Sequence, residues 1–294
     1  MPELPEVETI AQELQILLQG KKIQAVEILR ESIVRSPLTE FQAALVGRKI
    51  SKVKRRAKFL IFSLEDKKHP NPLLFLVVHL RMTGQFAFQT QPHLSPSQPF
   101  SALVYPQKMV PKNQRILFDF GKETLIYYDQ RALGQMAIFT PAHFQLLEKK
   151  WGVEPLGKEF TCKRLQNIIH KRKISLKTLL LDQKAIAGIG NIYASEILFA
   201  AGLHPKRIAS SLNAKEAEGL HFSLLKILKM AIAEKGTTFR DYKRTRQQTG
   251  NFQNFLKVYG RAGKTCFTCK DLVQKIKQNQ RSTFFCPQCQ PMSV

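Results

Sequence analysis

The first eight residues contain the side chains and backbone group with the most distinctive chemistry. After removal of Met1, Pro2 would present a secondary amine beside the carboxylate of Glu3. An α-amino group has a reference pKa of roughly 7.7–8.0, against about 10.4 for lysine, so more of it is neutral and nucleophilic near pH 7. A secondary amine that attacks a sugar aldehyde carbon forms an iminium ion, and a neighbouring carboxyl group can pass protons. The alternative is an ordinary helix start, with Pro5 in the first turn and glutamates near the positive end of the helix dipole.

Four cysteines near the other end have the spacing of a metal site. Cys266-x2-Cys269 is followed after sixteen residues by Cys286-x2-Cys289. This spacing predicts one zinc ion held by two short turns of a β-hairpin, and its role is structural because four protein ligands leave no position for water. Two disulfides or four free thiols are the alternatives. Both are disfavoured, because no secretory signal opens the sequence and Cys162 would be left without a disulfide partner. We expect Cys162 to be a small buried side chain.

The charge balance indicates the partner. Lys and Arg number 46 against 22 Asp and Glu, which gives a formal net charge of +24. Such an excess favours a polyanion, and nucleic acid is the first candidate. An anionic membrane surface is the rival, although no apolar run approaches the roughly 20 residues of a spanning helix. The basic runs at residues 52–58, 170–173, 240–246 and 261–264 each adjoin an apolar segment, which favours a folded basic groove over a disordered tail.

The pattern of elements predicts an α+β protein of several domains. Residues 1–140 read as a helix at 5–19 followed by short strands, which is typical of an antiparallel β-sandwich. We expect these strands at residues 23–30, 49–64, 73–80, 85–89, 115–120, 125–129 and 135–139, with a long loop at 90–112. A linker at 141–160 precedes a helical domain at 161–255 and a zinc-finger hairpin at 256–294. The helices are expected at residues 162–170, 176–181, 192–201 and 214–234.

A glycine-rich turn separates two of the predicted helices. Gly188 and Gly190 allow a tight turn, and Asn191 could cap the helix that follows. The free N–H groups of that helix start suit a phosphate. A dinucleotide site would need a third glycine and a preceding strand, which are both absent. A plain helix connection is the remaining alternative.

Six motifs in the right order resemble those of the bacterial formamidopyrimidine-DNA glycosylase family over essentially the whole chain. They are PELPEVE at 2–8, RRAK at 55–58, HLRMTG at 79–84, GNIYASE at 190–196, VYGR at 258–261, and QR at 280–281 within the zinc hairpin. The resemblance implies a bifunctional DNA glycosylase and abasic-site lyase of base-excision repair that removes 8-oxoguanine and formamidopyrimidines. It also implies an N-terminal sandwich, a helix–two-turn–helix around residues 188–191, and double-stranded DNA bound in the cleft between the halves. A cytoplasmic bacterial monomer is expected.

The resemblance assigns catalytic roles to four residues. Pro2 would attack C1′ of the damaged nucleotide and hold the sugar as a Schiff base, while Glu3 would protonate or relay protons as the sugar opens. Lys58, expected on a strand, would donate the proton linked to β-elimination; the alternative is a surface lysine. Arg281 resembles the arginine linked to δ-elimination, and Glu6 is a plausible second carboxylate ordering the site.

A second group is assigned to DNA contact. Its members are Met82, Asn113, Arg131, Leu133, Arg172, Lys177 and Asn191. A glycosylase takes its target nucleotide out of the stack, so Met82 and Leu133 would fill the gap and Arg131 would face the orphaned cytosine. Arg172, Lys177 and Asn191 would bind backbone phosphates, which position the DNA without reading its sequence. A core methionine is the alternative for Met82.

Several positions depart from the family pattern. Residues 129–134 read DQRALG where DPRRFG is usual, so Leu133 replaces an aromatic wedge and Ala132 an arginine. Asn113 stands where the family has a histidine, and Arg81 where glycine is common. Residues 240–254 correspond to a lesion-capping loop.

Two other functions remain open. One is the sister endonuclease VIII type, which prefers oxidised pyrimidines, although Leu4 and the Val7-Glu8 continuation favour the purine-lesion type. The other is a non-catalytic zinc-hairpin DNA-binding protein, against which the intact Pro2, Glu3 and Lys58 argue.

Overall fold

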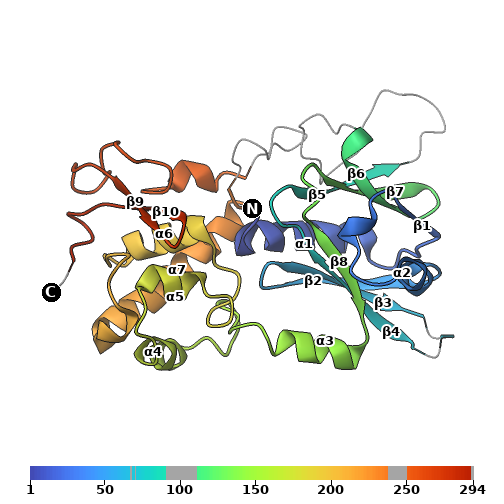
Figure 1. Cartoon of the computed structure of the whole chain (residues 1–294), viewed down its shortest axis with the longest axis horizontal. Helices are drawn as coiled ribbons and strands as arrows, with labels where there is room; N and C mark the ends of the chain where they lie inside the picture. Colours follow the sequence, from blue (N-terminus) through green and yellow to red (C-terminus); the bar gives the residue numbers. More distant parts are fainter. Residues whose placement is uncertain (67, 70, 91–110, 238–249, 293–294) are drawn as a thin grey trace. The chain divides into compact units, whose positions relative to one another are not determined.

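The computed structural model describes residues 1–66, 68–69, 71–90, 111–237 and 250–292. These residues form two compact units (Figure 1). Unit 1 contains residues 1–2, 6–148 and 235–250; unit 2 contains residues 3–5, 149–234 and 251–294. Most of the expected loop at 90–112 and of the capping loop at 240–254 lies outside the described residues. The division into three sequential domains with a linker at 141–160 remains a prediction.

Unit 1 is built on two four-stranded antiparallel sheets. One has the order β1 (Ala25–Ile28), β6 (Gln114–Asp119), β7 (Glu123–Asp129), β5 (Gly84–Thr90); the other has the order β2 (Lys49–Arg56), β3 (Phe59–Glu65), β4 (Leu73–His79), β8 (Gln135–Phe139). Apolar side chains of both sheets share one core with helix α1 (Leu4–Leu18), and the rings of Phe62 and Phe86 meet there with centroids 6.1 Å apart. The predicted antiparallel sandwich is confirmed.

Three features of unit 1 differ from the expectation. The strand expected at residues 49–64 is a hairpin that turns at Ala57 and Lys58, so Lys58 lies in the turn and not on a strand. The apolar alternation runs on through the turn, and Ala57 adopts a left-handed φ of 55° without the glycine or asparagine that usually marks one. Helices α2 (Leu38–Leu45) and α3 (Pro141–Glu148) were not expected, since each spans barely two turns.

Unit 2 is helical and ends in a hairpin. Its helices are α4 (Cys162–His170), α5 (Leu176–Leu181), α6 (Asn191–Ala200) and α7 (Ala214–Ala233), close to the expected bounds, and its strands are β9 (Gln274–Gln278) and β10 (Arg281–Phe285). The apolar faces of these helices form a second core, which also buries Leu4. Short 3₁₀ turns lie at Glu31–Ile33 and Pro111–Asn113 in unit 1 and at Ala209–Ser211 and Phe252–Phe255 in unit 2. None of the helices described is both long and apolar enough to span a membrane.

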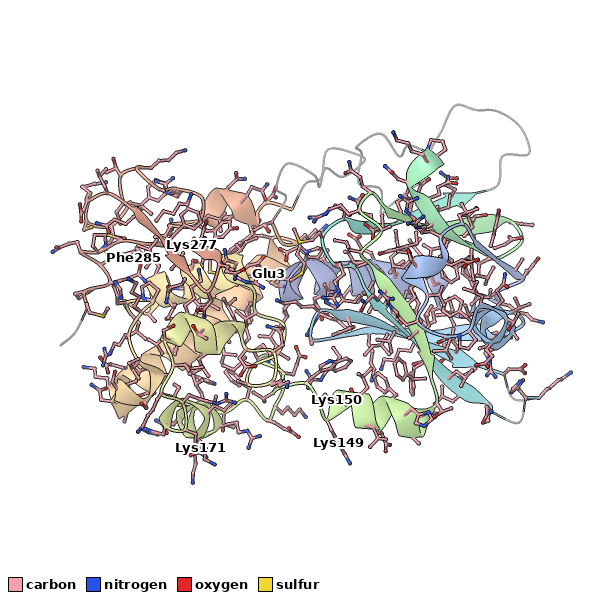
Figure 2. All side chains as sticks on the ribbon, in the orientation of Figure 1. Glu3, Lys149, Lys150, Lys171, Lys277 and Phe285 are labelled. Atoms are coloured by element: carbon pink, nitrogen blue, oxygen red, sulfur yellow. The ribbon has the colours of Figure 1, made fainter. Side chains whose placement is uncertain are left out.

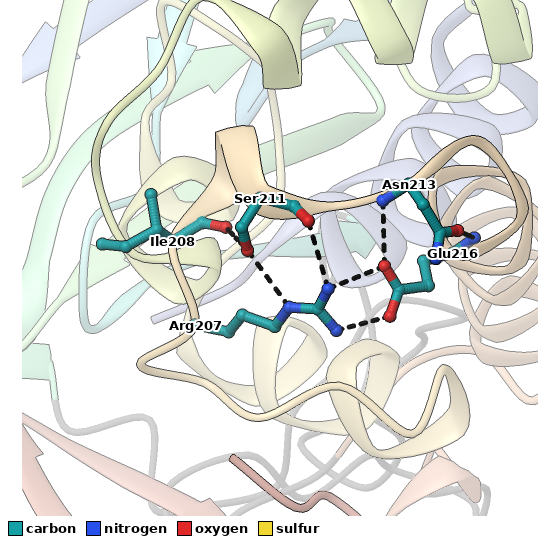
Figure 3. Close-up of polar contacts among 5 residues, drawn as sticks. All are labelled: Arg207, Ile208, Ser211, Asn213 and Glu216. Atoms are coloured by element: carbon teal, nitrogen blue, oxygen red, sulfur yellow. Dashed lines mark hydrogen bonds and ion pairs between the residues drawn. The ribbon is translucent and has the colours of Figure 1, made fainter. Parts of the chain in front are cut away.

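A polar network fixes the segment before α7 (Figure 3). The side chain of Asn213 accepts from the N–H of Glu216, and the Glu216 carboxylate accepts from the N–H of Asn213, which completes a capping box. Arg207 donates to the same carboxylate (2.7 Å), and this bond holds the pKa of Glu216 below its usual value. The carbonyl of Arg207 in turn accepts from the N–H of Leu176 (2.8 Å). The network therefore anchors the first turn of α5, where Lys177 lies.

Candidate active site and zinc centre

The carboxylate of Glu3 lies at the N-terminus of helix α6. Its oxygens accept from the backbone N–H groups of Ile192 (3.0 Å) and Tyr193 (3.4 Å), and its side chain is 3% exposed. The helix start predicted as a phosphate site is thus occupied by an anion of the same chain. The N-cap is Gly190, which has no side chain to cap with, and Asn191 is the first helical residue. The prediction that Asn191 caps α6 is wrong.

The glycine at position 190 makes room for this carboxylate. A Cβ added there would lie 2.2 Å from the carboxyl carbon of Glu3. The preceding turn is held by Gln183, whose side chain accepts from the N–H of Gly188 (2.9 Å) and donates to the carbonyl of Ile189 (2.8 Å). Gly190 and the turn held by Gln183 therefore fix the position of the carboxylate of Glu3, the residue that directly follows Pro2.

Lys177 lies in the interior of unit 2. Its side chain is 1% exposed, and its Nζ donates to the carbonyl of Ser282 (3.1 Å) and to the hydroxyl of Ser195 (3.3 Å). Burial lowers the pKa of Lys177 to about 8; nearby Glu3 opposes this shift and Arg281 adds to it. Its position differs from that of the exposed phosphate ligand expected from the sequence. It is placed instead to hold the hairpin and to balance the charge of Glu3.

The first residues of β10 are tied to α6. The Nδ2 of Asn191 donates to the carbonyl of Ser282 (2.9 Å), the same oxygen that Lys177 contacts. Arg281 precedes this anchored residue and is exposed at the turn of the β9–β10 hairpin. Unit 2 thus gathers Glu3, Lys177, Asn191 and Arg281 around the start of α6.

The four cysteines form the predicted metal cluster. One ligand atom from each of Cys266, Cys269, Cys286 and Cys289 lies within 4.8 Å of the others, and no carboxylate or imidazole of the described residues joins them. Cys162, half-buried on α4, is outside the cluster. Four thiolates at this separation suit one tetrahedral zinc ion without an open position, so the zinc is structural.

A buried carboxylate that the sequence did not single out supports the segment before this cluster. Glu196 on α6 is 2% exposed and accepts from three consecutive backbone N–H groups, those of Lys257 (2.8 Å), Val258 (3.0 Å) and Tyr259 (2.8 Å). Glu196 is the last residue of the GNIYASE motif, and Val258 and Tyr259 begin the VYGR motif, so these hydrogen bonds join the two motifs.

In unit 1, Lys58 is buried beside His79. Lys58 is 6% exposed, at the turn between β2 and β3. Burial, together with the charges of Arg81 and Lys58, lowers the pKa of His79 to about 3. His79 is therefore neutral at physiological pH, and its Nδ1 accepts from the N–H of Arg81 (3.0 Å). This bond fixes the turn that leads to Met82.

Two loops that carry predicted void-filling residues meet at one buried carboxylate. Asp129, which has no exposed surface, accepts from the hydroxyl of Thr83, from the N–H of Arg131 (3.2 Å) and from the N–H of Gly134 (2.7 Å). Met82 and Leu133 are 41% and 43% exposed on these loops. Their exposure argues against the alternative of a core methionine. The sequence missed Asp129, because nothing in its type distinguishes a strand-end carboxylate from a solvated one.

Three further residues predicted from the sequence have different surroundings. Asn113 ends a 3₁₀ turn before β6 and is half-buried. Arg172, just after α4, forms an ion pair with Asp182 (3.3 Å). Glu6 accepts from the N–H (2.7 Å) and the hydroxyl (3.0 Å) of Thr237.

Three family models match the chain in succession. The model described as the formamidopyrimidine-DNA glycosylase N-terminal domain covers residues 1–136, and the H2TH domain of the same glycosylase covers residues 151–243. The zinc finger found in FPG and IleRS covers residues 263–291. The chain belongs to the formamidopyrimidine-DNA glycosylase family.

Relatives and solved structures agree with this membership. The formamidopyrimidine-DNA glycosylase of Carboxydothermus hydrogenoformans is 40% identical over 99% of this chain and 100% of its own length, and that of Streptococcus pneumoniae serotype 4 is 36% identical over 99% of both. Lactococcus lactis Fpg complexes with Fapy-dG DNA and with abasic-site DNA each superpose with a TM-score of 0.85 at 33% identity, covering 99% of this chain and 100% of theirs. The resemblance, fold class and structural zinc predicted from the sequence are confirmed.

Proposed function

We propose that the chain is a bifunctional DNA glycosylase and abasic-site lyase that removes oxidised and ring-opened purines from double-stranded DNA. The observation that carries this proposal is the carboxylate of Glu3, buried against two N–H groups of α6 and adjacent in sequence to Pro2. A proline amine cannot do this chemistry while Met1 acylates it. The Lactococcus lactis neighbours in complex with Fapy-dG and abasic-site DNA support the substrate class.

The reaction follows from these groups. The Pro2 nitrogen attacks C1′, the bond from C1′ to the base breaks with its electron pair on the base, and the sugar ring opens to give an iminium ion. Loss of a C2′ proton then expels the 3′ phosphate, and loss of a C4′ proton in a second elimination expels the 5′ phosphate. Glu3 passes protons to and from the sugar, Lys58 assists the first elimination and Arg281 the second. The iminium cation acts as the electron sink in both eliminations.

The DNA is held by positioning residues and opened by void-filling ones. Arg172 and Asn191 hold backbone phosphates, while Asn113 contacts the strand near its turn. Met82 and Leu133 occupy the space of the extruded nucleotide, and Arg131 faces the unpaired cytosine. We infer a monomer acting on chromosomal DNA in the cytoplasm, since one chain supplies the nucleophile, the acid groups and all four zinc ligands.

A second candidate is excision of oxidised pyrimidines. One neighbour, Lactococcus lactis Fpg at a TM-score of 0.84, was solved with DNA containing an oxidised pyrimidine. In the sequence, Leu133 in place of an aromatic wedge also leaves lesion choice open. Purine lesions are favoured because the N-terminal motif is PELPEVE.

A lesion panel tests the proposal. Duplexes containing 8-oxoguanine, a formamidopyrimidine, thymine glycol or an abasic site, each opposite all four bases, are incubated with the Met1-processed protein and scored for strand cleavage. We expect cleavage of the two purine lesions with β,δ-elimination products. Glu3→Gln should excise 8-oxoguanine at least ~100-fold more slowly and still bind abasic DNA. The matched control is Glu40→Gln at an exposed position of α2.

Cleavage of thymine glycol in preference to the purines would replace the proposal by the second candidate. Binding to all duplexes without cleavage would identify a non-catalytic DNA-binding protein.

A further inference from the structure

A cavity of about 370 Å³ lies in unit 2, lined by the segment after α3, by α4 and the two residues that follow it, and by Lys184 and Ala185. Its polar and aromatic lining includes Lys149, Trp151, Arg164, Lys171, Arg172 and Lys184. We call this cavity the basic pocket. Figure 2 shows Lys149 and Lys171 at the edge of the unit, away from Glu3 and from Lys277 of the zinc hairpin. The basic pocket is therefore separate from the residues gathered around the start of α6.

The lining of the basic pocket is strongly cationic. It includes five Lys or Arg side chains and no carboxylate. Arg172 pairs with Asp182, with side chains 42% and 26% exposed, while Lys149, Arg164, Lys171 and Lys184 have no ion pair with any described residue. The four cations without an ion pair repel one another, and an anion between them would reduce this repulsion. The charge thus favours a phosphate-bearing ligand.

The floor of the basic pocket is rigid. Gly152 donates to the carbonyl of Gln183 (2.8 Å), Val153 donates to the carbonyl of Ala185 (3.2 Å), and Ala187 donates back to the carbonyl of Val153 (3.0 Å). A Cβ at Gly152 would lie 2.5 Å from the carbonyl carbon of Ala185, so only glycine permits this approach. The ladder holds Trp151 at the wall of the cavity before any ligand arrives.

We propose that the basic pocket binds a nucleoside phosphate, with the phosphate among the cations and the base against the indole of Trp151. The volume is within the range of small-molecule sites, and aromatic rings bind bases by stacking without selecting their sequence. The ligand is either a free nucleotide or a nucleotide of a single-stranded DNA segment. This inference does not rest on the glycosylase activity.

Trp151 is the only tryptophan of the chain, so its fluorescence reports directly on the basic pocket. The processed protein is titrated at low salt with dAMP, with inorganic phosphate and with a 5′-phosphorylated oligothymidylate of four nucleotides. We expect a saturable change with dAMP at lower concentration than with phosphate, and weaker binding as KCl rises. A tighter response to the oligonucleotide than to dAMP identifies a DNA strand as the source, and the reverse identifies a free nucleotide.

The variant Arg164→Glu/Lys184→Glu should weaken dAMP binding at least ~10-fold, because repulsion replaces attraction. Lys163→Glu/Lys229→Glu is the matched control, since it changes the net charge equally at exposed positions of α4 and α7 outside the cavity. Zinc content and thermal melting verify the fold of both. No response of Trp151 to any ligand, equal weakening in both double variants, or equal affinities for phosphate and dAMP would overturn the inference. Strand cleavage by the Arg164→Glu/Lys184→Glu protein is scored separately, so failure of the pocket and failure of the glycosylase proposal are distinguishable.

Discussion

Replacing Asp129 by asparagine should uncouple the two loops that carry Met82 and Leu133. The carboxylate accepts three hydrogen bonds, through Oδ1 from Thr83 and Arg131 and through Oδ2 from Gly134. Asparagine can keep an oxygen at only one of these positions. If its oxygen serves Thr83 and Arg131, its amide N–H groups face the buried N–H of Gly134.

The cost follows from these contacts. A hydrogen bond to a charged group contributes roughly 1.5–3 kcal/mol, about twice the contribution of a neutral one, and an unsatisfied buried donor costs roughly 1–3 kcal/mol. Halving two charged bonds removes roughly 1.5–3 kcal/mol and leaving the third donor unsatisfied costs roughly 1–3 kcal/mol, so the free energy of unfolding should fall by about 2.5–6 kcal/mol. Asp119→Asn is the control, because Asp119 accepts only one backbone bond, from Gly121 (2.7 Å), in a half-buried turn. It should cost less than about 1 kcal/mol.

Two assays check this prediction. Denaturant unfolding gives the loss of stability, and 2-aminopurine placed beside an 8-oxoguanine reports unstacking when the void-filling loops enter the duplex. We expect Asp129→Asn to lose most of the fluorescence change at saturating protein, and Asp119→Asn to retain it. Wild-type fluorescence and stability in Asp129→Asn would refute the idea that Asp129 holds the two loops in place.

Three further perturbations have defined outcomes. Gly190→Ala places a Cβ within 2.2 Å of the Glu3 carboxyl carbon, so excision of 8-oxoguanine should fall by about 100-fold while zinc stays at one per chain. Wild-type rates would contradict the role given to Gly190 in positioning the Glu3 carboxylate. Cys266→Ser should lower zinc below one per chain, as measured by atomic absorption, and weaken duplex binding, because the metal supplies folding free energy to the hairpin that carries Arg281. Full DNA affinity in the zinc-free protein would exclude this role. The pKa of Lys177 falls from 10.5 to about 8 on folding, so the unfolded chain binds more protons than the folded chain between these two pH values. The free energy of unfolding of the wild type should therefore rise with pH across this window, by at most about 3 kcal/mol relative to Lys177→Met. A pH-independent difference in unfolding free energy would count against a buried ammonium.

The sequence predicted the elements whose signal is local. Alternating strands, the amphipathic α4 and the capped α7 lie within one or two residues of the expected bounds, and the cysteine spacing identified the metal cluster. The hairpin at Ala57 was missed, because its left-handed residue carries no turn signature. Short helices such as α2 were missed for a different reason, because two turns give too little periodicity.

The site could be predicted only as a set of residue types. Nothing in the sequence reveals that the N–H groups of α6 bind Glu3, which is 189 residues from Ile192, or that Lys177 points into the interior. Such contacts depend on the packing of distant segments. The supporting carboxylates Asp129 and Glu196 were missed because burial, not residue type, gives them their role.

Borohydride trapping with mapping of the linkage tests the central claim most directly. The Met1-processed protein is mixed with an 8-oxoguanine duplex and sodium borohydride, digested, and analysed by mass spectrometry. A sugar remnant on the amino-terminal Pro2 peptide is expected, and no adduct should form with protein whose amino terminus is acetylated or extended. An adduct on any lysine, or undiminished trapping by the blocked protein, would contradict the assignment of Pro2 as the nucleophile.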